Sequence, residues 1–285
     1  MSSSTIALRR RAADYGATAI SYIAALVVLA PLVAILSYLL MKGATSSNLA
    51  FFTEIPKPVG EAGGGMANAI GGSLLILGIA SAIGIPVGVG TGVYLAEIAR
   101  SGIGRGIRFL TDVLNGVPSI VIGLAAYSLV VIRQKHFSAI SGGIALGAMM
   151  IPTIARATEE MLKLVPLSVR EAALGLGIPQ WRTTLSITLR SALPGIITGI
   201  MLAFSRIAGE TAPLLFTAFG NAFWNWDPRQ PTAALPLQIF VYAISPFEDW
   251  HRKAWAGALV LVAIIMVSVF AVRWVASRGT FKGTS

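Results

Sequence analysis

The sequence VPLSVREAALGLGIPQWRTTLSITLRSALPGIITGIMLAFSRIAGETAPLLFTAF occupies Val165–Phe219 and combines two kinds of segment. Its first half is too polar to cross a membrane and has the pattern of a short helix, a tight glycine turn and a second helix. Its second half is an apolar span that contains Arg206 and Glu210. A polar surface element is therefore joined directly to a membrane helix that carries charges.

The composition of the whole chain supports a membrane protein. Of its 285 residues, 55% are hydrophobic and only 12% are charged, and the mean hydropathy is +0.76. A soluble globular protein of this size carries more charge, so the chain is predicted to be an integral membrane protein. The net charge of +10 comes from residues spread over short linkers, and this distribution argues against nucleic-acid binding.

Sites that need thiols or histidine clusters are not predicted. The chain has no cysteine, which excludes a disulfide framework and a thiolate metal site. Its two histidines, His136 and His251, lie far apart in the sequence without other ligands nearby. We therefore expect neither a metal site nor a catalytic centre.

The apolar runs predict an all-α, polytopic membrane protein with six transmembrane helices in a single domain, residues 1–285. The runs cover residues 17–41, 67–99, 110–132, 138–155, 192–219 and 254–276. A bilayer core needs about 20 apolar residues per helix, and most of these runs reach that length. A cleaved signal peptide is the alternative for the first run, although its apolar part should be shorter and end in a small-residue cleavage site.

The distribution of Lys and Arg predicts the orientation. With the N-terminus inside, fourteen basic residues fall on the cytoplasmic side and seven on the other, with Arg206 inside a span. The cytoplasmic residues are Arg9, Arg10, Arg11, Arg100, Arg105, Arg108, Arg156, Lys163, Arg170, Arg182, Arg190, Arg273, Arg278 and Lys282. The positive-inside rule therefore predicts a multi-pass protein of the cell membrane with both termini, and the polar loop 156–191, in the cytoplasm.

The polar loop has local signals for a compact helix. Pro166 ends the preceding helix, and Ser168 with Glu171 three residues later matches a capping box, which predicts a helix that starts at Ser168. Gly177 suits the left-handed turn at the end of that helix, and Pro179 suits the first turn of the next one. Such a knob can enter a groove of a partner protein, or it can simply lie on the membrane surface.

The same loop resembles a known family. EAALGLG, with Ile187 and SALPG at Ser191–Gly195, resembles the EAA loop of ABC-importer permeases, the coupling element that docks into an ATP-binding subunit. The matching positions are Glu171, Ala172, Ala173, Leu174 and Gly177. The sequence departs from the family pattern at Arg190, where a proline is usual.

Three further segments resemble the phosphate permeases of the PstA type. They are NAIGGSL at Asn68–Leu74, GVPSIVIGL at Gly116–Leu124 and GETAPLLFTA at Gly209–Ala218. The resemblance implies a permease subunit of an ATP-driven phosphate importer. It also implies a second related permease subunit (PstC-like), two ATP-binding subunits (PstB-like) and a phosphate-binding protein (PstS-like).

The chain itself lacks the means to bind ATP by a Walker A loop. It contains no Gly-Lys dipeptide, which that loop requires. We therefore predict that it is not an enzyme and binds no cofactor, and that ATP and Mg²⁺ are used by the partner subunit.

Arg206 and Glu210 are the candidates for the translocation path, together with the neighbouring Thr211. Arg206 lies about 20 Å along a helix that starts near Leu193, which is close to the middle of the membrane. If the helix is continuous, the two charges share one face and can neutralise each other. They are then either a buried ion pair that fixes helix packing, or a transient oxyanion site in which Glu210 weakens the hold of the guanidinium.

Other residues are weaker candidates. Asn115, Pro118 and Ser119 suit either a pore lining or a kink in the third span. Glu97 and Asp112, near the ends of spans, suit interfacial charges. Three tryptophans near the last loop, Trp224, Trp226 and Trp250, suit an interfacial belt more than contact with a substrate-delivering protein.

Three other functions stay open. The first is an ABC permease for another solute, such as sulfate, molybdate or an amino acid. The second is a channel or carrier that works without ATP, which leaves the docking loop unexplained. The third is a purely structural membrane protein, which gives Arg206 and Glu210 no purpose.

Overall fold

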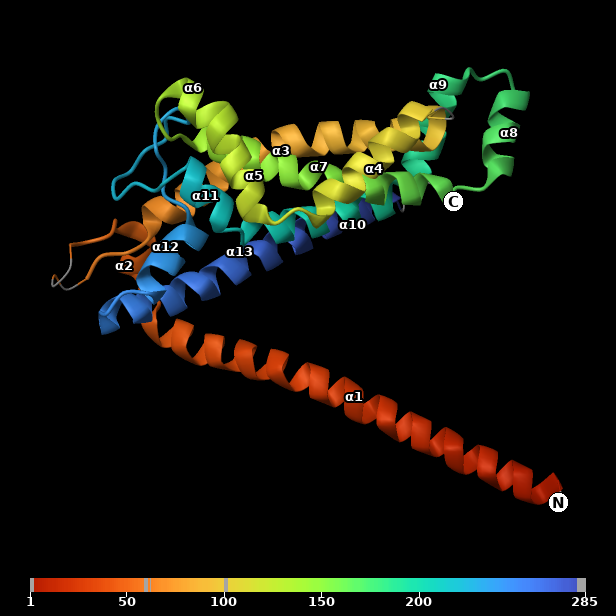
Figure 1. Cartoon of the computed structure of the whole chain (residues 1–285), viewed down its shortest axis with the longest axis horizontal. Helices are drawn as coiled ribbons and strands as arrows, with labels where there is room; N and C mark the ends of the chain where they lie inside the picture. The colour runs from red at the N-terminus through yellow and green to blue at the C-terminus, as the bar shows by residue number, and fades with distance from the viewer. Residues whose placement is uncertain (1–2, 59–60, 62, 100–101, 281–285) are drawn as a thin grey trace.

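A computed structural model describes residues 3–58, 61, 63–99 and 102–280. Two of the basic residues counted for the orientation, Arg100 and Lys282, lie outside this part of the chain. Within it, helices dominate, and strand-like pairing is limited to one bridge between Phe219 and Thr232. The predicted all-α class is therefore confirmed (Figure 1).

The helices fall into long rods and short connecting turns. The long ones are α1 (Ser3–Ser46), α3 (Ala67–Val93), α4 (Gly102–Gly116), α7 (Ala139–Lys163), α10 (Leu189–Ala208) and α13 (Glu248–Thr280). The short ones are α2 (Leu49–Thr53), α5 (Ser119–Ala126), α6 (Ile132–Gln134), α8 (Leu167–Gly175), α9 (Gln180–Thr183), α11 (Ala212–Thr217) and α12 (Leu235–Ala243). Three π-helical turns, η1 (Tyr94–Ile98), η2 (Tyr127–Val131) and η3 (Thr184–Thr188), continue α3, α5 and α9.

The centre of the bundle is the contact between α3 and α7, which run parallel and close together. A methyl group on Gly88 would lie 2.7 Å from Cβ of Ile154, and one on Gly92 would lie 2.5 Å from Cβ of Thr158. Only glycine allows this approach, as is common where membrane helices pack through small residues. α10 packs on the same core through Ala203 and Ile207.

Helix α1 diverges from the bundle, as Figure 1 shows in red. It is anchored against α13 near its C-terminal end, where the rings of Tyr38 and Trp255 meet edge to face at 5.0 Å. Only 6% of the apolar stretch in Ala13–Ser46 is buried inside the chain. Such a long and exposed apolar helix requires lipid or another protein around it.

By length and composition, five helices can cross a membrane, or six if one bent pair forms a single span. The bent pair joins Gly102–Gly116 to Ser119–Gln134 at an angle of 106°. It corresponds to the predicted span 110–132, which was expected to be an ordinary helix. Pro118 precedes α5 and has no amide hydrogen to continue the helix, which explains the break.

Two other predicted boundaries were wrong. Helix α7 continues to Lys163, so Arg156–Lys163 are part of a span and not of the polar loop. The predicted span 192–219 is not one helix, because α10 ends at Ala208 and α11 begins at Ala212. Gly209 ends α10, and Pro213 in the first turn of α11 starts a new helix.

Candidate functional site

The polar loop after α7 forms an exposed helical knob. Figure 1 shows α8 and α9 protruding together at one end of the bundle. Glu171 and Ala172 are exposed, Ala173 is buried, and Leu174 is 49% exposed. An apolar side chain exposed on a short helix suits contact with a partner protein.

The end of α8 follows the prediction and its start does not. Gly177 has φ of +77°, the Gly177 amide donates to the Leu174 carbonyl, and the Ile178 amide donates to the Ala173 carbonyl. This pair of bonds is a Schellman motif, which requires the left-handed glycine. The predicted capping box was wrong, because α8 starts at Leu167 after Pro166 and has no side-chain cap. The first turn of α8 is exposed, so water can satisfy the amides that a capping side chain would otherwise bind.

Helix α8 is tied to the bundle by an ion pair. The Arg170 guanidinium lies 3.0 Å from the carboxylate of Glu97 in η1, and that carboxylate is only 7% exposed. The same guanidinium donates a 2.6 Å hydrogen bond to the Leu162 carbonyl at the end of α7. Arg170 therefore connects the knob to two of the central helices.

A second arginine makes a similar connection nearby. Arg108 of α4 lies 2.6 Å from the carboxylate of Glu159 in α7 and donates to the Leu95 carbonyl in η1. Glu159 is 1% exposed and also pairs with Lys163 at 2.5 Å. Together, Arg108, Glu159, Glu97 and Arg170 form a cluster that we call the inner clamp. The clamp holds α3, α4, α7 and α8 at one end of the bundle.

The sequence did not indicate the inner clamp. Glu97 was expected only as an interfacial charge, Arg108 and Arg170 were expected only as cytoplasmic charges, and Glu159 was not singled out. The spacing of Glu159 and Lys163 gave a signal, since charges four residues apart pair on a helix. The pairs Arg108–Glu159 and Glu97–Arg170 depend on tertiary contacts, which no local pattern predicts.

A cavity of about 720 Å³ lies beside the knob. It is lined by Val93, Glu97, Ile98, Gln180, Trp181, Thr184 and Leu185. Trp181, one of the lining residues, is 66% exposed. The cavity lies between η1 and the start of the α9–α10 rod.

The break after α10 places the charged residues differently from the prediction. Arg206 lies in the last turn of α10, whereas Glu210 lies beyond the helix end and Thr211 precedes α11. Arg206 is exposed and Glu210 is half-buried. Among the described residues, neither side chain forms an ion pair or a hydrogen bond. The expected shared helix face was therefore wrong, because Gly209 ends the helix between the two charges.

At this break, the Arg206 guanidinium is available to bind an anion. A cation in the last turn of a helix interacts well with the helix dipole. A guanidinium without a carboxylate partner keeps all its donors available for a ligand. In Figure 1, the break after α10 and the break between α4 and α5 lie at a similar position along the bundle. Both interruptions thus lie away from the two ends of the bundle.

The other break carries the remaining candidates. Asn115 lies in the last turn of α4 and accepts a 3.0 Å hydrogen bond from the Thr153 hydroxyl of α7. Pro118 and Ser119 begin α5, with Pro118 exposed and Ser119 half-buried. Asn115 therefore fixes the end of α4 on α7, while Pro118 turns the chain.

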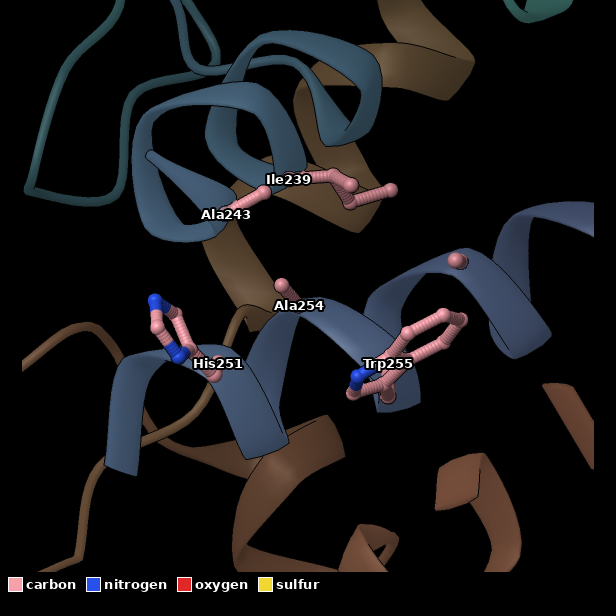
Figure 2. Close-up of a pocket in the computed structure, with 6 residues that line it drawn as sticks. Ile239, Ala243, His251, Ala254 and Trp255 are labelled. Carbon is pink, nitrogen blue, oxygen red and sulfur yellow. The ribbon is translucent and has the colours of Figure 1, made fainter. Parts of the chain in front are cut away.

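A separate apolar groove lies between α12 and α13. It has a volume of about 410 Å³, and Figure 2 shows Ile239, Ala243, His251, Ala254 and Trp255 around it. The His251 ring nitrogen Nε2 lies 2.6 Å from the Ser245 carbonyl and donates to it. The groove contains no lysine or arginine, so it is a poor site for an anion.

The chain matches the model of the family "Binding-protein-dependent transport system inner membrane component" over residues 84–279. It is 50% identical over 227 residues to a protein of Yersinia pestis named "Phosphate transport system permease protein PstA", covering 79% of this chain and 77% of that protein. The protein of the same name from Xylella fastidiosa strain Temecula1 is 45% identical over 278 residues, covering 97% and 96%.

Similarity extends to more distant relatives and to solved structures. "Phosphate transport system permease protein PstA 1" of Mycobacterium tuberculosis strain H37Rv is 36% identical over 281 residues, covering 96% of this chain and 91% of that one. A chain of the inward-facing MetNI methionine ABC transporter superposes with a TM-score of 0.59 at 16% identity, covering 77% of this chain and 98% of that chain. The fold is thus that of ABC-transporter permeases.

Proposed function

The chain belongs to the binding-protein-dependent transport inner membrane components, and within them to the PstA phosphate transport permeases, and we propose that it forms half of a path through which inorganic phosphate crosses the membrane. The observation that supports this proposal is the family membership, since the chain is 45% identical to a PstA protein over nearly the full length of both. The energy comes from a separate ATP-binding subunit, since the chain has no Gly-Lys dipeptide for a Walker A loop.

The break after α10 supplies the contact with phosphate in this proposal. Arg206 is exposed and has no partner among the described residues, and a guanidinium fits the oxygens of phosphate in a fork geometry. Glu210 follows on the loop and weakens anion binding by repulsion. Thr211 offers only a single hydroxyl donor, so few hydrogen bonds hold the anion. Weak and brief binding is what conduction requires.

The knob supplies the contact with the ATPase. Residues Glu171, Ala172, Ala173, Leu174 and Gly177 form a compact element with an exposed apolar side chain. Closure of the ATP-binding subunits, which use ATP and Mg²⁺, pulls on this element. Arg170 and Glu97 then pass the movement to α3 and α7.

The complete transporter in this proposal contains a second related permease chain, two ATP-binding subunits and an external phosphate-binding protein. The resemblance of the three motifs to PstA-type permeases implies PstC-like, PstB-like and PstS-like partners. Both termini and the knob face the cytoplasm, as the excess of basic residues on that side predicts.

The test is uptake of radiolabelled phosphate by the complete complex in liposomes that contain ATP and the phosphate-binding protein. We expect uptake that depends on ATP and is not reduced by excess sulfate or molybdate. Competition by sulfate or molybdate would indicate another solute. Uptake by this chain alone without ATP would indicate a channel or carrier.

A further inference from the structure

The exposed strip of helix α7 is charged, although α7 lies at the centre of the bundle. Of the 25 residues of α7, those that are exposed are Ala148, Arg156, Glu160 and Lys163. The last three follow each other at spacings of four and three, so they lie on one face of the helix. The peripheral helices α1 and α13 instead expose apolar side chains such as Leu26 and Met266.

Helix α4 faces this strip with polar residues of its own. Asn115 pairs with Thr153 at 3.0 Å, Asp112 lies 3.9 Å from Arg156, and Arg108 pairs with Glu159 at 2.6 Å. The contacts move along α4 and α7 in opposite directions, which is the register of two antiparallel helices. A polar seam therefore runs from the break at Asn115 to the inner clamp.

The outward face of α4 is different. Ile103, Phe109 and Leu110 on that face are 68%, 71% and 56% exposed. This contrast distinguishes the two faces of α4, since the apolar side chains suit contact with lipid and the charged ones do not. Helix α4 thus separates an apolar surface from the seam.

The seam is buried where it meets the inner clamp, since the Glu159 side chain is 1% exposed, but the charges next to it are not. The Asp112, Arg156 and Glu160 side chains are 57%, 44% and 55% exposed. Arg156 lies about 26 Å along α7 from Ala139, near the end of a membrane core of about 30 Å, and Glu160 and Lys163 follow beyond it. Charges at this end of a span disfavour contact with lipid, so the strip faces water or protein.

We propose that the seam lines a water-filled vestibule that opens toward the knob, and that Arg156 is a second oxyanion-binding residue on the path from the membrane to the cytoplasm. This rests on the proposed phosphate transport. Arg156 is held by Glu160 at 2.9 Å and more loosely by Asp112, so a passing oxyanion exchanges with two carboxylates. The exchange keeps binding weak, as release requires.

The absence of cysteine in the natural sequence makes the vestibule testable. The variants Asp112→Cys and Glu160→Cys each introduce one thiol into this chain of the assembled complex, in inside-out membrane vesicles. A charged, membrane-impermeant methanethiosulfonate reagent is then added, and the label on this chain is read by mass spectrometry. Leu26→Cys on α1 is the matched control, since its side chain is 67% exposed but surrounded by apolar residues.

We expect labelling at positions 112 and 160 and none at position 26. Absence of label at both seam positions overturns the vestibule. Equal labelling at all three positions also overturns it, because the reagent would then not distinguish water from lipid. The result of the labelling experiment does not depend on which solute is carried.

The role of Arg156 is tested by phosphate itself. Inorganic phosphate, and not the same concentration of chloride, should slow labelling at position 160. Arg156→Gln should reduce phosphate uptake roughly tenfold or more, since a charge-assisted hydrogen bond is lost. Arg156→Lys should recover part of the uptake, and Arg11→Gln, which removes an exposed charge from α1, should change little.

The outcomes separate the two proposals. Normal uptake and normal ATP hydrolysis in Arg156→Gln overturn the binding role of Arg156. Loss of complex assembly in both Arg156→Gln and Arg156→Lys also overturns it, because the residue would then be structural. Absence of phosphate uptake in the unmodified complex, with the seam still labelled, instead overturns the proposed function and leaves the vestibule.

Discussion

The inner clamp and the break after α10 both place charges within the transmembrane bundle, but they surround them differently. In the clamp, the carboxylates of Glu159 and Glu97 are 1% and 7% exposed and each pairs with an arginine. At the break, Arg206 is exposed and has no partner among the described residues. The clamp pairs its charges within the chain, although Oε2 of Glu159 and Nε of Arg170 have no hydrogen-bond partner among the described residues, whereas the break leaves a cation without an ion pair.

This difference separates the structural role of a membrane charge from a transport role. Charges inside a membrane protein pair with one another or face a path for ions. A paired and buried charge fixes the arrangement of helices, and its loss should lower stability. An exposed and unpaired charge contributes little to folding, and its loss should lower transport. Substitutions in the two regions should therefore affect different measurements.

The largest effect is expected for Glu159→Gln. The change leaves Arg108 and Lys163 without the carboxylate that both contact. Removing one partner of a fully buried ion pair costs about 3–5 kcal/mol. Arg108 and Lys163 are 28% and 53% exposed, so water reduces that cost, but the thermal unfolding temperature and the yield of the purified complex should still fall clearly. Glu160→Gln is the matched control, since its carboxylate is 55% exposed and an exposed pair contributes at most about 1 kcal/mol. Equal losses in the two variants would contradict the structural role of the clamp.

The next largest effect is expected for Arg206→Met. Loss of one charge-assisted hydrogen bond to an anion weakens binding by about 1.5–3 kcal/mol, or roughly ten- to a hundredfold. Phosphate uptake should fall by that factor, while the unfolding temperature and ATP hydrolysis stay close to those of the unmodified complex. Near-normal uptake would remove Arg206 from the path. A loss of stability similar to that of Glu159→Gln would mean that Arg206 has a structural partner in the assembled complex.

The comparison also explains what could be predicted from the sequence. The all-α class, the membrane location and the glycine turn at Gly177 depend on composition and local patterns, and the structure confirms them. The shared face of Arg206 and Glu210 was predicted on the assumption of a continuous helix. Gly209 and Pro213 interrupt that helix, although glycine and proline are also common inside membrane helices.

The inner clamp could not be predicted for a different reason. Arg108 and Glu159 are 51 residues apart in sequence, and the contact depends on how α4 crosses α7. Arg170 precedes the EAA segment and was expected only as a cytoplasmic charge. Pairing between distant residues is set by helix packing, whereas capping and turn signals are local.

A smaller effect is expected when the pair Glu97–Arg170 is altered. Glu97→Gln or Arg170→Gln should reduce the phosphate transported per ATP hydrolysed several-fold, because the knob loses its link to η1. Residues in direct contact typically interact by about 0.5–3 kcal/mol. The exchange variant, with Glu97→Arg and Arg170→Glu together, should recover part of the coupling. The measurement is the ratio of uptake to ATP hydrolysis in liposomes.

Failure of the exchange would count against the link. If Glu97→Arg and Arg170→Glu each lower the ratio and the exchange lowers it by the product of their two factors, the residues act independently. If the ratio stays normal and only the unfolding temperature falls, the pair stabilises the fold and does not transmit movement.

The smallest effect is expected for Gly177→Ala, which changes no charge. Gly177 has φ of +77°, and a methyl group there costs about 1 kcal/mol because the left-handed region is unfavourable for other residues. Gly175→Ala is the matched control, since Gly175 lies in α8 with a helical backbone and open space around it. We expect Gly177→Ala to reduce the ratio of uptake to ATP hydrolysis modestly and Gly175→Ala to leave it unchanged. If both variants reduce the ratio equally, the surface of the knob determines coupling and its C-terminal turn does not. If Gly177→Ala alone reduces it, the ion pair of Arg170 is not sufficient, and the angle between α8 and α9 also contributes to coupling.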